Sequence, residues 1–329
     1  MDTIQRTTTA DVGGPAQALT NKLSMRQRFW RTLRKNYLLY LILLPGLLHL
    51  VIFKWAPLGG LVIAFQNFSP FQGVFGSQWV GFEQFTKFLH DPAIPHLLAN
   101  TLLLAFFTLL FSFPAPIIFA LFLNEVRNRY VRKSVQTFSF LPYFVSSAVV
   151  VSILYTLVSP QGGLVNEALG FFGIKPIFFM AEPGWFRPLY VLINVWQTFG
   201  YGTIIYIAAM TTIDPALYEA AEIDGAGRWK KMWNITLPSI SNMMIVMFIL
   251  NIGQILSVDL DKVLLMYGPS VYETADVIQT YVYRQAFAPH GFPNYSYGAA
   301  VGLIQAVLAL VMVVGANRAA KKFSDSRLF

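Results

Sequence analysis

The sequence predicts an all-α membrane protein with six transmembrane helices, and three observations support this fold class. The first is composition: 55% of the 329 residues are hydrophobic and 12% are charged, roughly half the charge of a typical soluble domain. The second is a series of long runs without a charged residue. The third is an uneven distribution of Lys and Arg between those runs. Together they argue against a soluble globular protein.

Six uncharged runs supply the expected crossings. A helix needs roughly 20 apolar residues to span about 30 Å of hydrocarbon, and each run reaches or approaches that length. The runs are Tyr37–Phe53, Pro92–Asn124, Ser134–Gly163, Pro188–Ile213, Pro238–Val258 and Gly291–Asn317. The first run is the shortest, and we expect its weakly polar continuation to extend it as far as Phe65. Helices are expected because backbone groups in lipid must pair within the segment, and the short alternating strands of a barrel are missing. Kinks are expected near Pro114, Pro116 and Pro142.

The distribution of basic residues orients these crossings. With the N-terminus inside, 18 of the 24 Lys and Arg residues fall in the N-terminal tail, in Arg127–Lys133, in Arg228–Lys231 and after Asn317. This excess follows the positive-inside rule and predicts that both termini are cytoplasmic. It also accounts for the net charge of +8, which therefore indicates anchoring at the cytoplasmic membrane surface and says little about an anionic substrate or a nucleic acid. The chain has no cysteine, so disulfides and thiolate chemistry are excluded.

The chain is expected to have four parts: a disordered cytoplasmic tail (1–23), a basic interfacial segment (24–36), a six-helix transmembrane domain (37–317) and a cytoplasmic C-terminal tail (318–329). No small-residue cleavage pattern follows the first apolar run, so we expect a signal anchor. Two segments on the expected outer side, Gln66–Pro95 and Asp259–His290, are long and rich in aromatic residues. An aromatic belt at the membrane interface and a platform for an external protein remain equally open interpretations of them.

A charged insert interrupts the apolar sequence between the fourth and fifth crossings. It reads EAAEIDGAGRWKKMWNITLP over residues 219–238. Asp214, followed by a proline, predicts the start of a helix, and Gly225 and Gly227 predict its end. Residues 228–233 can form a second short helix with one apolar face. We therefore expect a cytoplasmic helix–turn–helix element between the crossings.

The chemistry of this element, called loop 214–238 below, favours docking. Its small residues allow a neighbouring surface to approach closely, its tryptophans are of the kind that anchor protein interfaces, and its charged residues can add polar contacts at the rim. These residues are Ala220, Ala221, Trp229, Trp233, Glu219 and Arg228. Packing of the loop on its own bundle or on lipid headgroups is the alternative that chemistry alone leaves open.

The same loop resembles the signature of permease subunits in binding-protein-dependent ATP-binding-cassette (ABC) importers. That signature is EAA, three residues, Gly, nine residues, Ile, one residue and Leu-Pro. It is matched without a gap by Glu219, Ala220, Ala221, Gly225, Ile235, Leu237 and Pro238. The overlapping IDGA is the common form in the carbohydrate branch. The segments ADVIQTYVYRQAF, AAVGLIQAVLALVMVVGANRAAKKF and the closing SRLF are similar to polysaccharide-type permeases, which include importers of alginate and other uronate-containing saccharides. The resemblance covers roughly residues 36–329.

This resemblance implies a non-catalytic, multi-pass subunit of the bacterial inner (plasma) membrane. In that family the loop docks on a cytoplasmic ATPase dimer that binds ATP and Mg²⁺, and a second permease completes the path. A periplasmic solute-binding protein delivers the substrate, which the resemblance implies to be an oligosaccharide, with alginate-like saccharides among the candidates. Glu219 would face the ATPase, Gly225 would make the turn and Pro238 would fix the exit into the fifth crossing. The chain lacks the Gly-x-x-x-x-Gly-Lys-[Ser/Thr] phosphate cradle, which fits this division of labour. No cofactor is expected on this chain.

Two other classes were weighed against the importer. An ATP-independent secondary carrier or channel is the main alternative. Ion-coupled carriers place ionisable residues inside the crossings, whereas here every Asp, Glu, Lys and Arg is expected outside the crossing cores, and His49 is a lone intramembrane histidine. A membrane enzyme is weaker still, because His90, His96 and His290 have no recognised metal spacing and no acid–base pair stands out.

Amide and phenol side chains within the crossings are candidates for the substrate path, because saccharides need hydrogen-bond partners. Asn194, Gln197 and Tyr201 fall at i, i+3 and i+7 in the fourth crossing, and Asn251 and Gln254 are three residues apart in the fifth. Amides are costly in hydrocarbon unless they face protein or water. Hydrogen bonding between helices at a permease–permease interface is the alternative. Gln305 is a weaker addition.

Overall fold

The computed structural model describes residues 33–287 and 293–323. The expected tail 1–23, most of the basic segment 24–36 and the end of the expected tail 318–329 lie outside the described residues. The chain divides into two units, Met1–Gly60 and Leu61–Phe329. They are taken separately here.

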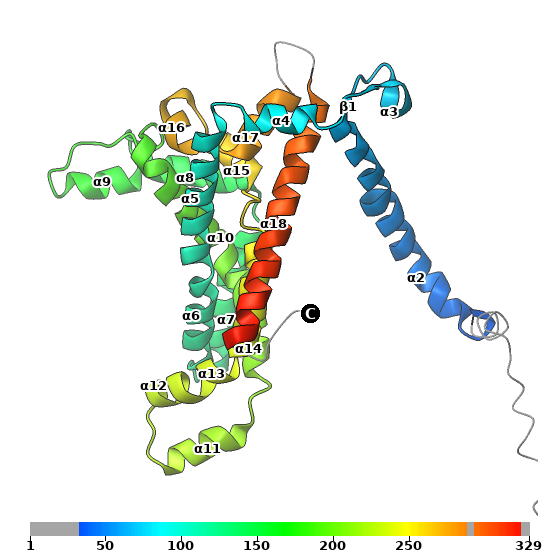
Figure 1. Ribbon diagram of the computed structural model, residues 1–329. Coiled ribbons are helices and arrows are strands. Elements are labelled where there is room, and N and C mark those ends of the chain that lie inside the picture. The colour runs from blue at the N-terminus through cyan, green and yellow to red at the C-terminus, as the bar shows by residue number, and fades with distance from the viewer. Residues whose placement is uncertain (1–32, 288–292, 324–329) are drawn as a thin grey trace, which may run out of the picture. The chain divides into compact units, whose positions relative to one another are not determined.

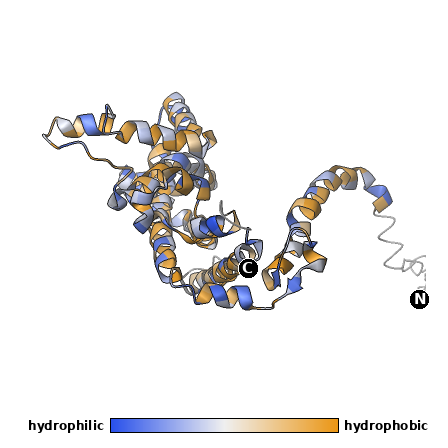
Figure 2. Cartoon of the chain, turned by 90° about the horizontal axis from the view of Figure 1, so that it is seen from above, coloured by the Kyte–Doolittle hydropathy of each residue, from blue (hydrophilic) through white to orange (hydrophobic). Residues whose placement is uncertain are grey.

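The first unit is dominated by one apolar helix. Helix α2 (Tyr37–Leu50) continues through a π-helical turn η1 (Val51–Trp55) into the 3₁₀-helix η2 (Ala56–Phe65), so that residues Tyr37–Phe65 form one candidate membrane span. The expected extension to Phe65 is confirmed. Helix α2 is largely hydrophobic along its length (Figure 2), and none of its residues is buried, as expected of a helix whose apolar side chains face lipid or another protein. The span contains Lys54, which lies in the weakly polar continuation beyond the uncharged run Tyr37–Phe53.

The second unit starts at Leu61 within η2, and a short hairpin and two short helices follow. Strands β1 (Gln66–Asn67) and β2 (Gln78–Trp79) pair antiparallel with Gln66 opposite Trp79, and they flank helix α3 (Gly73–Gly76). Helix α4 (Glu83–Leu89) follows and packs on the last long helix, α18 (Tyr295–Phe323). Figure 1 shows α4 crossing one end of the long helices of this unit.

Helices α5 (Ile94–Ser112) and α6 (Pro114–Asn124) together form one candidate span. The predicted proline kink does not divide it, because Phe113 keeps helical torsion angles (φ −75°, ψ −48°) and Pro114 occupies the first position of α6, where a missing N–H costs little. Helix α10 (Pro183–Met210) is a further span and packs against α5, α6 and the next helix, α7 (Arg129–Phe140). It begins before the expected start at Pro188 and includes Arg187, so this candidate span also contains a charged residue.

Two expected crossings are bent. Helix α7 and the 3₁₀-turn η3 (Leu141–Phe144) meet α8 (Ser147–Val158) at 104°, and the expected kink near Pro142 lies at this break. The second pair comprises α12 (Arg228–Lys231), the π-helical turn η4 (Met232–Thr236) and α13 (Leu237–Ser239), which meet α14 (Ser241–Gly253) at 59°. The described residues thus contain four helices long and apolar enough to span a membrane, and six if each bent pair counts as one.

Short helices connect the long ones. They are α9 (Leu164–Gly170), α11 (Pro215–Ile223), α15 (Leu260–Met266), η5 (Pro269–Val271), α16 (Tyr272–Ala275) and α17 (Ile278–Ala286). Figure 1 shows α11 and α12 beyond one end of the long helices and α15, α16 and α17 toward the other. Asn166 fixes the α9 segment, because its amide nitrogen donates to the carbonyl oxygens of Val158, Ser159 and Ile177 and its amide oxygen accepts from Ile177 N.

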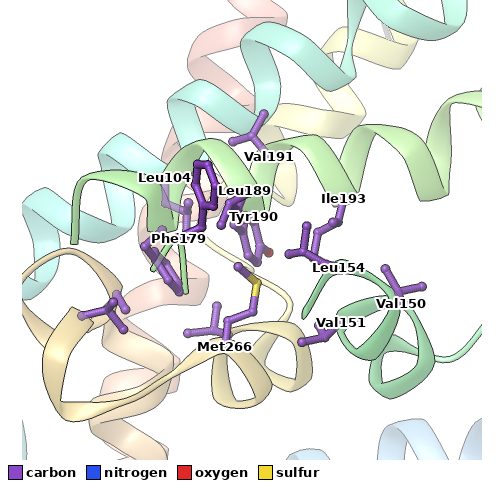
Figure 3. Packing of buried hydrophobic residues seen from close by; sticks show 14 of the residues in the cluster. Leu104, Val150, Val151, Leu154, Phe179, Leu189, Tyr190, Val191, Ile193 and Met266 are labelled. Carbon is purple, nitrogen blue, oxygen red and sulfur yellow. The ribbon is translucent and has the colours of Figure 1, made fainter. Parts of the chain in front are cut away.

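The largest buried cluster lies where α10 meets α5, α8 and α15. Leu189, Tyr190 and Ile193 of α10 belong to it with Leu154 of α8 and Met266 of α15 (Figure 3). A second cluster joins α4, α5, α17 and α18, and a third joins α6, α10 and the start of α14. Helix α10 thus takes part in two of the three clusters and is the central element of this unit.

A close approach at Gly200 holds α10 against α7. A Cβ atom at this position would lie 1.9 Å from the carbonyl oxygen of Ser139. We expect Gly200→Ala to force the two helices apart and to destabilise the protein by about 1–3 kcal/mol, the usual cost of overpacking. Thermal unfolding in detergent measures this effect. Gly184→Ala is the matched control on the same helix, because a Cβ there meets nothing within 4 Å. Equal unfolding temperatures for the two variants would contradict the close approach.

Candidate functional site

Loop 214–238 begins and turns as its sequence predicts. The side chain of Asp214 accepts a hydrogen bond from Ala216 N at 2.9 Å and caps α11, with proline at the first helical position. Gly225 ends the helix with φ +71°, a torsion angle that favours glycine. Its N–H donates to Glu222 O, and Ala226 N donates to Ala221 O at 2.8 Å, which satisfies the last carbonyl groups of the helix. The turn therefore depends on local hydrogen bonds and on glycine.

Two side-chain contacts tie the halves of the loop together. Tyr218 of α11 and Thr236 of η4 share a hydrogen bond between hydroxyl groups at 2.9 Å. Lys231 of α12 forms an ion pair with Glu222 of α11, with Nζ 2.6 Å from Oε1. This hydrogen bond from Lys231 holds the pKa of Glu222 below its usual range. Trp229 also contacts Phe122 of α6 edge to face, with ring centroids 6.1 Å apart.

Most of the outer surface of the loop is exposed among the residues that the structure describes. Glu219, Ala220 and Arg228 are exposed, and Ala221 is half-buried. Ile223, Trp229 and Trp233 are 87%, 63% and 60% exposed. The apolar face predicted for residues 228–233, which form α12 and the start of η4, is divided: Met232 is buried, whereas the two tryptophans are exposed. Ile235 and Leu237 are half-buried and Pro238 is exposed. The arrangement offers a wide apolar surface with charges at its edge, the chemistry of a protein interface.

A cavity of about 590 Å³ lies within the second unit, between α5, α6, α10 and α14. Four of the five expected path residues line it: Asn194, Tyr201, Asn251 and Gln254. The remaining polar wall comes from Thr108, Ser112, Thr198, Ser257 and Asp259. The cavity thus combines hydroxyl, amide and carboxylate groups with apolar walls, as small-molecule sites commonly do.

Aromatic rings form one wall of this cavity. Tyr143 of η3 and Tyr201 of α10 stack face to face with centroids 4.0 Å apart and planes 6° apart, and both line the cavity. Phe140 lies beside this pair, with its ring centroid 5.8 Å from that of Tyr201 and 6.4 Å from that of Tyr143. Flat apolar rings beside hydrogen-bonding groups suit the apolar face and the hydroxyl groups of a sugar ring.

Comparison with known proteins identifies the family of a chain with this fold and this cavity. Residues 112–324 match the family described as "Binding-protein-dependent transport system inner membrane component". The chain is 43% identical over 322 residues to the "Polygalacturonan/rhamnogalacturonan transport system permease protein YteP" of Bacillus subtilis, with 98% of this chain and 99% of YteP covered. The chain belongs to this inner-membrane permease family.

Other relatives agree with this assignment. The permease is 43% identical over 297 residues to Protein LplB of Bacillus subtilis, covering 90% of this chain and 92% of LplB. It is also similar to a chain in the crystal structure of a bacterial alginate ABC transporter in complex with an alginate pentasaccharide-bound periplasmic protein. That match has a TM-score of 0.81 and 38% identity and covers 92% of this chain and 100% of the other. The resemblance to binding-protein-dependent permeases and the inner-membrane location are confirmed.

Two predicted path residues of the permease lie away from the cavity. Gln197 is buried, and its amide nitrogen donates to Val145 O at 2.7 Å, across the break between η3 and α8. Helix geometry explains the difference: seven residues bring Tyr201 within about 20° of Asn194 around the helix axis, whereas three residues place Gln197 about 60° to the side. Gln305 of α18 is half-buried, does not line the cavity, and its amide nitrogen has no hydrogen-bond partner among the described residues.

Sequence reasoning missed several cavity residues. Tyr143 follows Pro142, where only a kink is expected, and Asp259 and Lys262 fall in the expected outer segment Asp259–His290. In the structure Tyr143 and Asp259 line the cavity, and Lys262 donates to Asn194 in its wall. The spacing of Asp259 and Lys262 indicates an ion pair at the start of a helix. The neighbouring sequence does not indicate that this pair lies beside α10. Among the described residues, no group of three or more His, Cys, Asp and Glu residues could hold a metal ion.

A polar network stabilises the end of the unit that carries α16 and α17. Arg284 forms two hydrogen bonds of 2.8 Å to the carboxylate of Asp276, which also accepts from Thr280 and Tyr267. Burial alone would raise the pKa of Asp276, but these hydrogen bonds outweigh it and hold the pKa below its ordinary value. The network therefore stabilises the fold above the ordinary pKa of an aspartate, and this contribution is lost as the pH falls through the lowered pKa.

Asp276→Asn tests this network. We expect the variant to unfold at a lower temperature than the natural protein at pH 6, with the difference shrinking as the pH falls below about 4, where the aspartate of the unfolded chain is largely protonated. Unfolding temperatures in detergent across this pH range provide the measurement. Asp261→Asn, which changes an exposed carboxylate of α15, should leave the unfolding temperature nearly unchanged. A difference of the same size at every pH would contradict the role of the ionised carboxylate.

Proposed function

We propose that this permease is the membrane-spanning subunit of an ABC importer for oligosaccharides. It would form the translocation path with a second, similar permease. A periplasmic binding protein would deliver the saccharide, and a cytoplasmic ATPase dimer that binds ATP and Mg²⁺ would drive its movement. In this proposal the chain itself holds no cofactor and performs no catalysis. Oligosaccharides that contain uronates are the favoured class, since YteP and the alginate transporter are named for such polymers.

The observation that carries the proposal is the exposed surface of loop 214–238 in a chain of this family. Glu219, Ala220 and Trp229 face outward, while Tyr218 and Lys231 tie the loop internally. Such an element can receive a partner and transmit its movement to α14, which continues from the loop. The chain has no phosphate-binding cradle of its own, so a separate ATPase is the proposed source of energy. The path would pass through the cavity beside Asn194, Tyr201, Asn251 and Gln254.

Affinity purification from mild detergent tests the proposed assembly. We expect an ATPase, a second permease and a saccharide-binding protein to be identified by mass spectrometry among the co-purifying chains. A variant with Trp229→Ala and Trp233→Ala should lose the ATPase and keep the second permease, because both side chains are mostly exposed on the loop. Purification of the permease as a homogeneous single component that transports sugar without ATP would support a secondary carrier and contradict the proposal.

The proposal also places six spans with both termini and loop 214–238 in the cytoplasm. Because the chain contains no cysteine, single cysteines can be labelled selectively. Ile223 in the loop and Phe171 after α9 are 87% and 91% exposed, so both accept the substitution readily. A membrane-impermeant maleimide should label Phe171→Cys in intact spheroplasts and Ile223→Cys only after the membrane is opened. The reverse pattern would contradict this topology.

A further inference from the structure

A buried lysine lies directly behind the wall of the cavity. Lys262 of α15 is 3% exposed. Its ammonium group is 3.1 Å from Oδ2 of Asp259 and donates to Oδ1 of Asn194, also at 3.1 Å. Burying a charge is costly unless it is paired and hydrogen-bonded. These two contacts provide that pairing.

Both partners of the lysine line the cavity. Asn194 receives Lys262 on its amide oxygen and donates from its amide nitrogen to Ser112 Oγ at 3.1 Å, so α15, α10 and α5 are joined at this wall. Asp259 is the only carboxylate among the lining residues, which include no Lys or Arg. The cavity therefore has one carboxylate in its lining, and that carboxylate is paired with the buried ammonium group of Lys262.

The two members of the ion pair are held very differently. The side chain of Lys262 is 4% exposed, whereas that of Asp259 is 34% exposed. Asp259 can therefore turn into water, while the ammonium group stays in place. An ammonium group has three N–H donors, and two acceptors serve it here, which leaves one N–H without an acceptor among the described residues.

We propose that Lys262 is the group that binds a carboxylate of the substrate in the cavity, and that Asp259 is an internal counter-ion replaced by that carboxylate. This inference rests on the proposed function and narrows its substrate class to acidic oligosaccharides. The exchange of one carboxylate for another leaves the charge around Lys262 unchanged, so a uronate can enter although the surface of the cavity carries a negative group. A neutral sugar cannot make the exchange. In the low dielectric of the interior this pairing is stronger than in water and gives a preference for acidic substrates.

The sequence alone pointed away from this conclusion. The net charge was explained by cytoplasmic anchoring, and the expected outer segments carry a slight excess of acidic residues. A count of charges cannot reveal that one lysine of these segments is buried beside Asn194, 68 residues away along the chain. The competing explanation is that the ion pair only stabilises the start of α15, where Asp259 also accepts from Lys262 N.

Equilibrium binding to the purified importer distinguishes these explanations. The assembled complex in detergent, without the binding protein, is titrated with a tetrauronate and with the neutral tetrasaccharide made from it by reduction of its carboxyl groups. We expect the natural importer to bind the tetrauronate at least about tenfold more tightly. Lys262→Gln should abolish this preference. Asp259→Asn should increase it several-fold, because asparagine caps a helix as well as aspartate and no longer competes for the ammonium group. Lys175→Gln, which changes an exposed lysine, is the matched control and should leave the preference unchanged.

Each other outcome has a definite meaning. An unchanged preference in both Lys262→Gln and Asp259→Asn, or the absence of any preference in the natural importer, would overturn the carboxylate site while leaving the cavity as a saccharide path. Failure of both oligosaccharides to bind to the natural importer would overturn the cavity itself as the path, and the carboxylate site with it. If Lys262→Gln does not fold, Asp259→Asn alone decides, since it keeps the buried lysine and the helix cap.

Discussion

Replacement of Gly225 by proline is expected to abolish sugar uptake and the ATP hydrolysis that substrate stimulates. The backbone of Gly225 has φ +71°, whereas proline is restricted to about −65°. Proline also removes the N–H that donates to Glu222 O at 3.0 Å. The end of α11 would therefore be rebuilt, and Glu219 and Ala220 would no longer present the same surface to an ATPase.

Uptake and ATPase rates in proteoliposomes measure this effect, with the amount of inserted permease determined in parallel. Gly227→Ala is the matched control two residues away: its φ of −69° is accessible to any residue and a Cβ there meets nothing within 4 Å. It should retain nearly full activity. Glu219→Lys, which reverses an exposed charge without altering the turn, should also lose coupling. Normal transport by a Glu219→Lys, Gly225→Pro double variant would rule out the loop as the ATPase contact.

Replacement of Asn251 by leucine is expected to reduce uptake about tenfold or more, equivalent to roughly 1.4 kcal/mol of lost interaction at the limiting step. Asn251 lines the cavity, and among the described residues the only hydrogen bond of its side chain runs to Met247 O in its own helix. Leucine has a similar size, so the fold should be preserved. It removes the amide oxygen and nitrogen that could bind a sugar hydroxyl, and an unpaired hydroxyl in a partly buried site is costly.

Transport by reconstituted importer and saccharide binding by the isolated binding protein should be measured together, because only the first is expected to change. Asn242→Leu provides the control: Asn242 is exposed on the same helix, does not line the cavity, and lies nine residues away, on the opposite side of the helix. If the two variants transport equally well, Asn251 has a packing role and the path lies elsewhere.

Local signals in the sequence were sufficient to predict the helix start and the turn of loop 214–238. A cap at Asp214 and a turn at Gly225 depend on neighbouring residues, so both could be predicted without knowledge of the tertiary structure. The long apolar runs likewise predicted most helices, since composition alone determines which segments suit lipid. The angle of the break between Phe144 and Ser147 could not be predicted, because a proline indicates a weak point in a helix but not the direction that packing imposes.

Contacts between distant residues account for what the sequence did not reveal. Spacing placed Asn194, Gln197 and Tyr201 on one stripe, but only the packing of neighbouring helices decides which edge of that stripe meets the cavity. Tyr143 stacks on Tyr201 from 58 residues away, and Lys262 reaches Asn194 from α15. No periodicity connects such pairs. Charged residues were expected outside the crossing cores because a charged side chain in lipid has a high free-energy cost. Protein groups that pair with such a side chain lower this cost, but they become visible only in the three-dimensional structure.

The two clamps within loop 214–238 have a mechanical consequence. Tyr218 and Lys231 fasten α11 to the segment that continues into α14, so a push on α11 cannot be absorbed by slack in the turn at Gly225. The loop would therefore move as one rigid element that pivots at the 59° bend before α14. Removing both contacts with Tyr218→Phe and Lys231→Gln should leave a loop that still binds the ATPase but transmits its movement poorly. ATP would then be hydrolysed with little sugar transported.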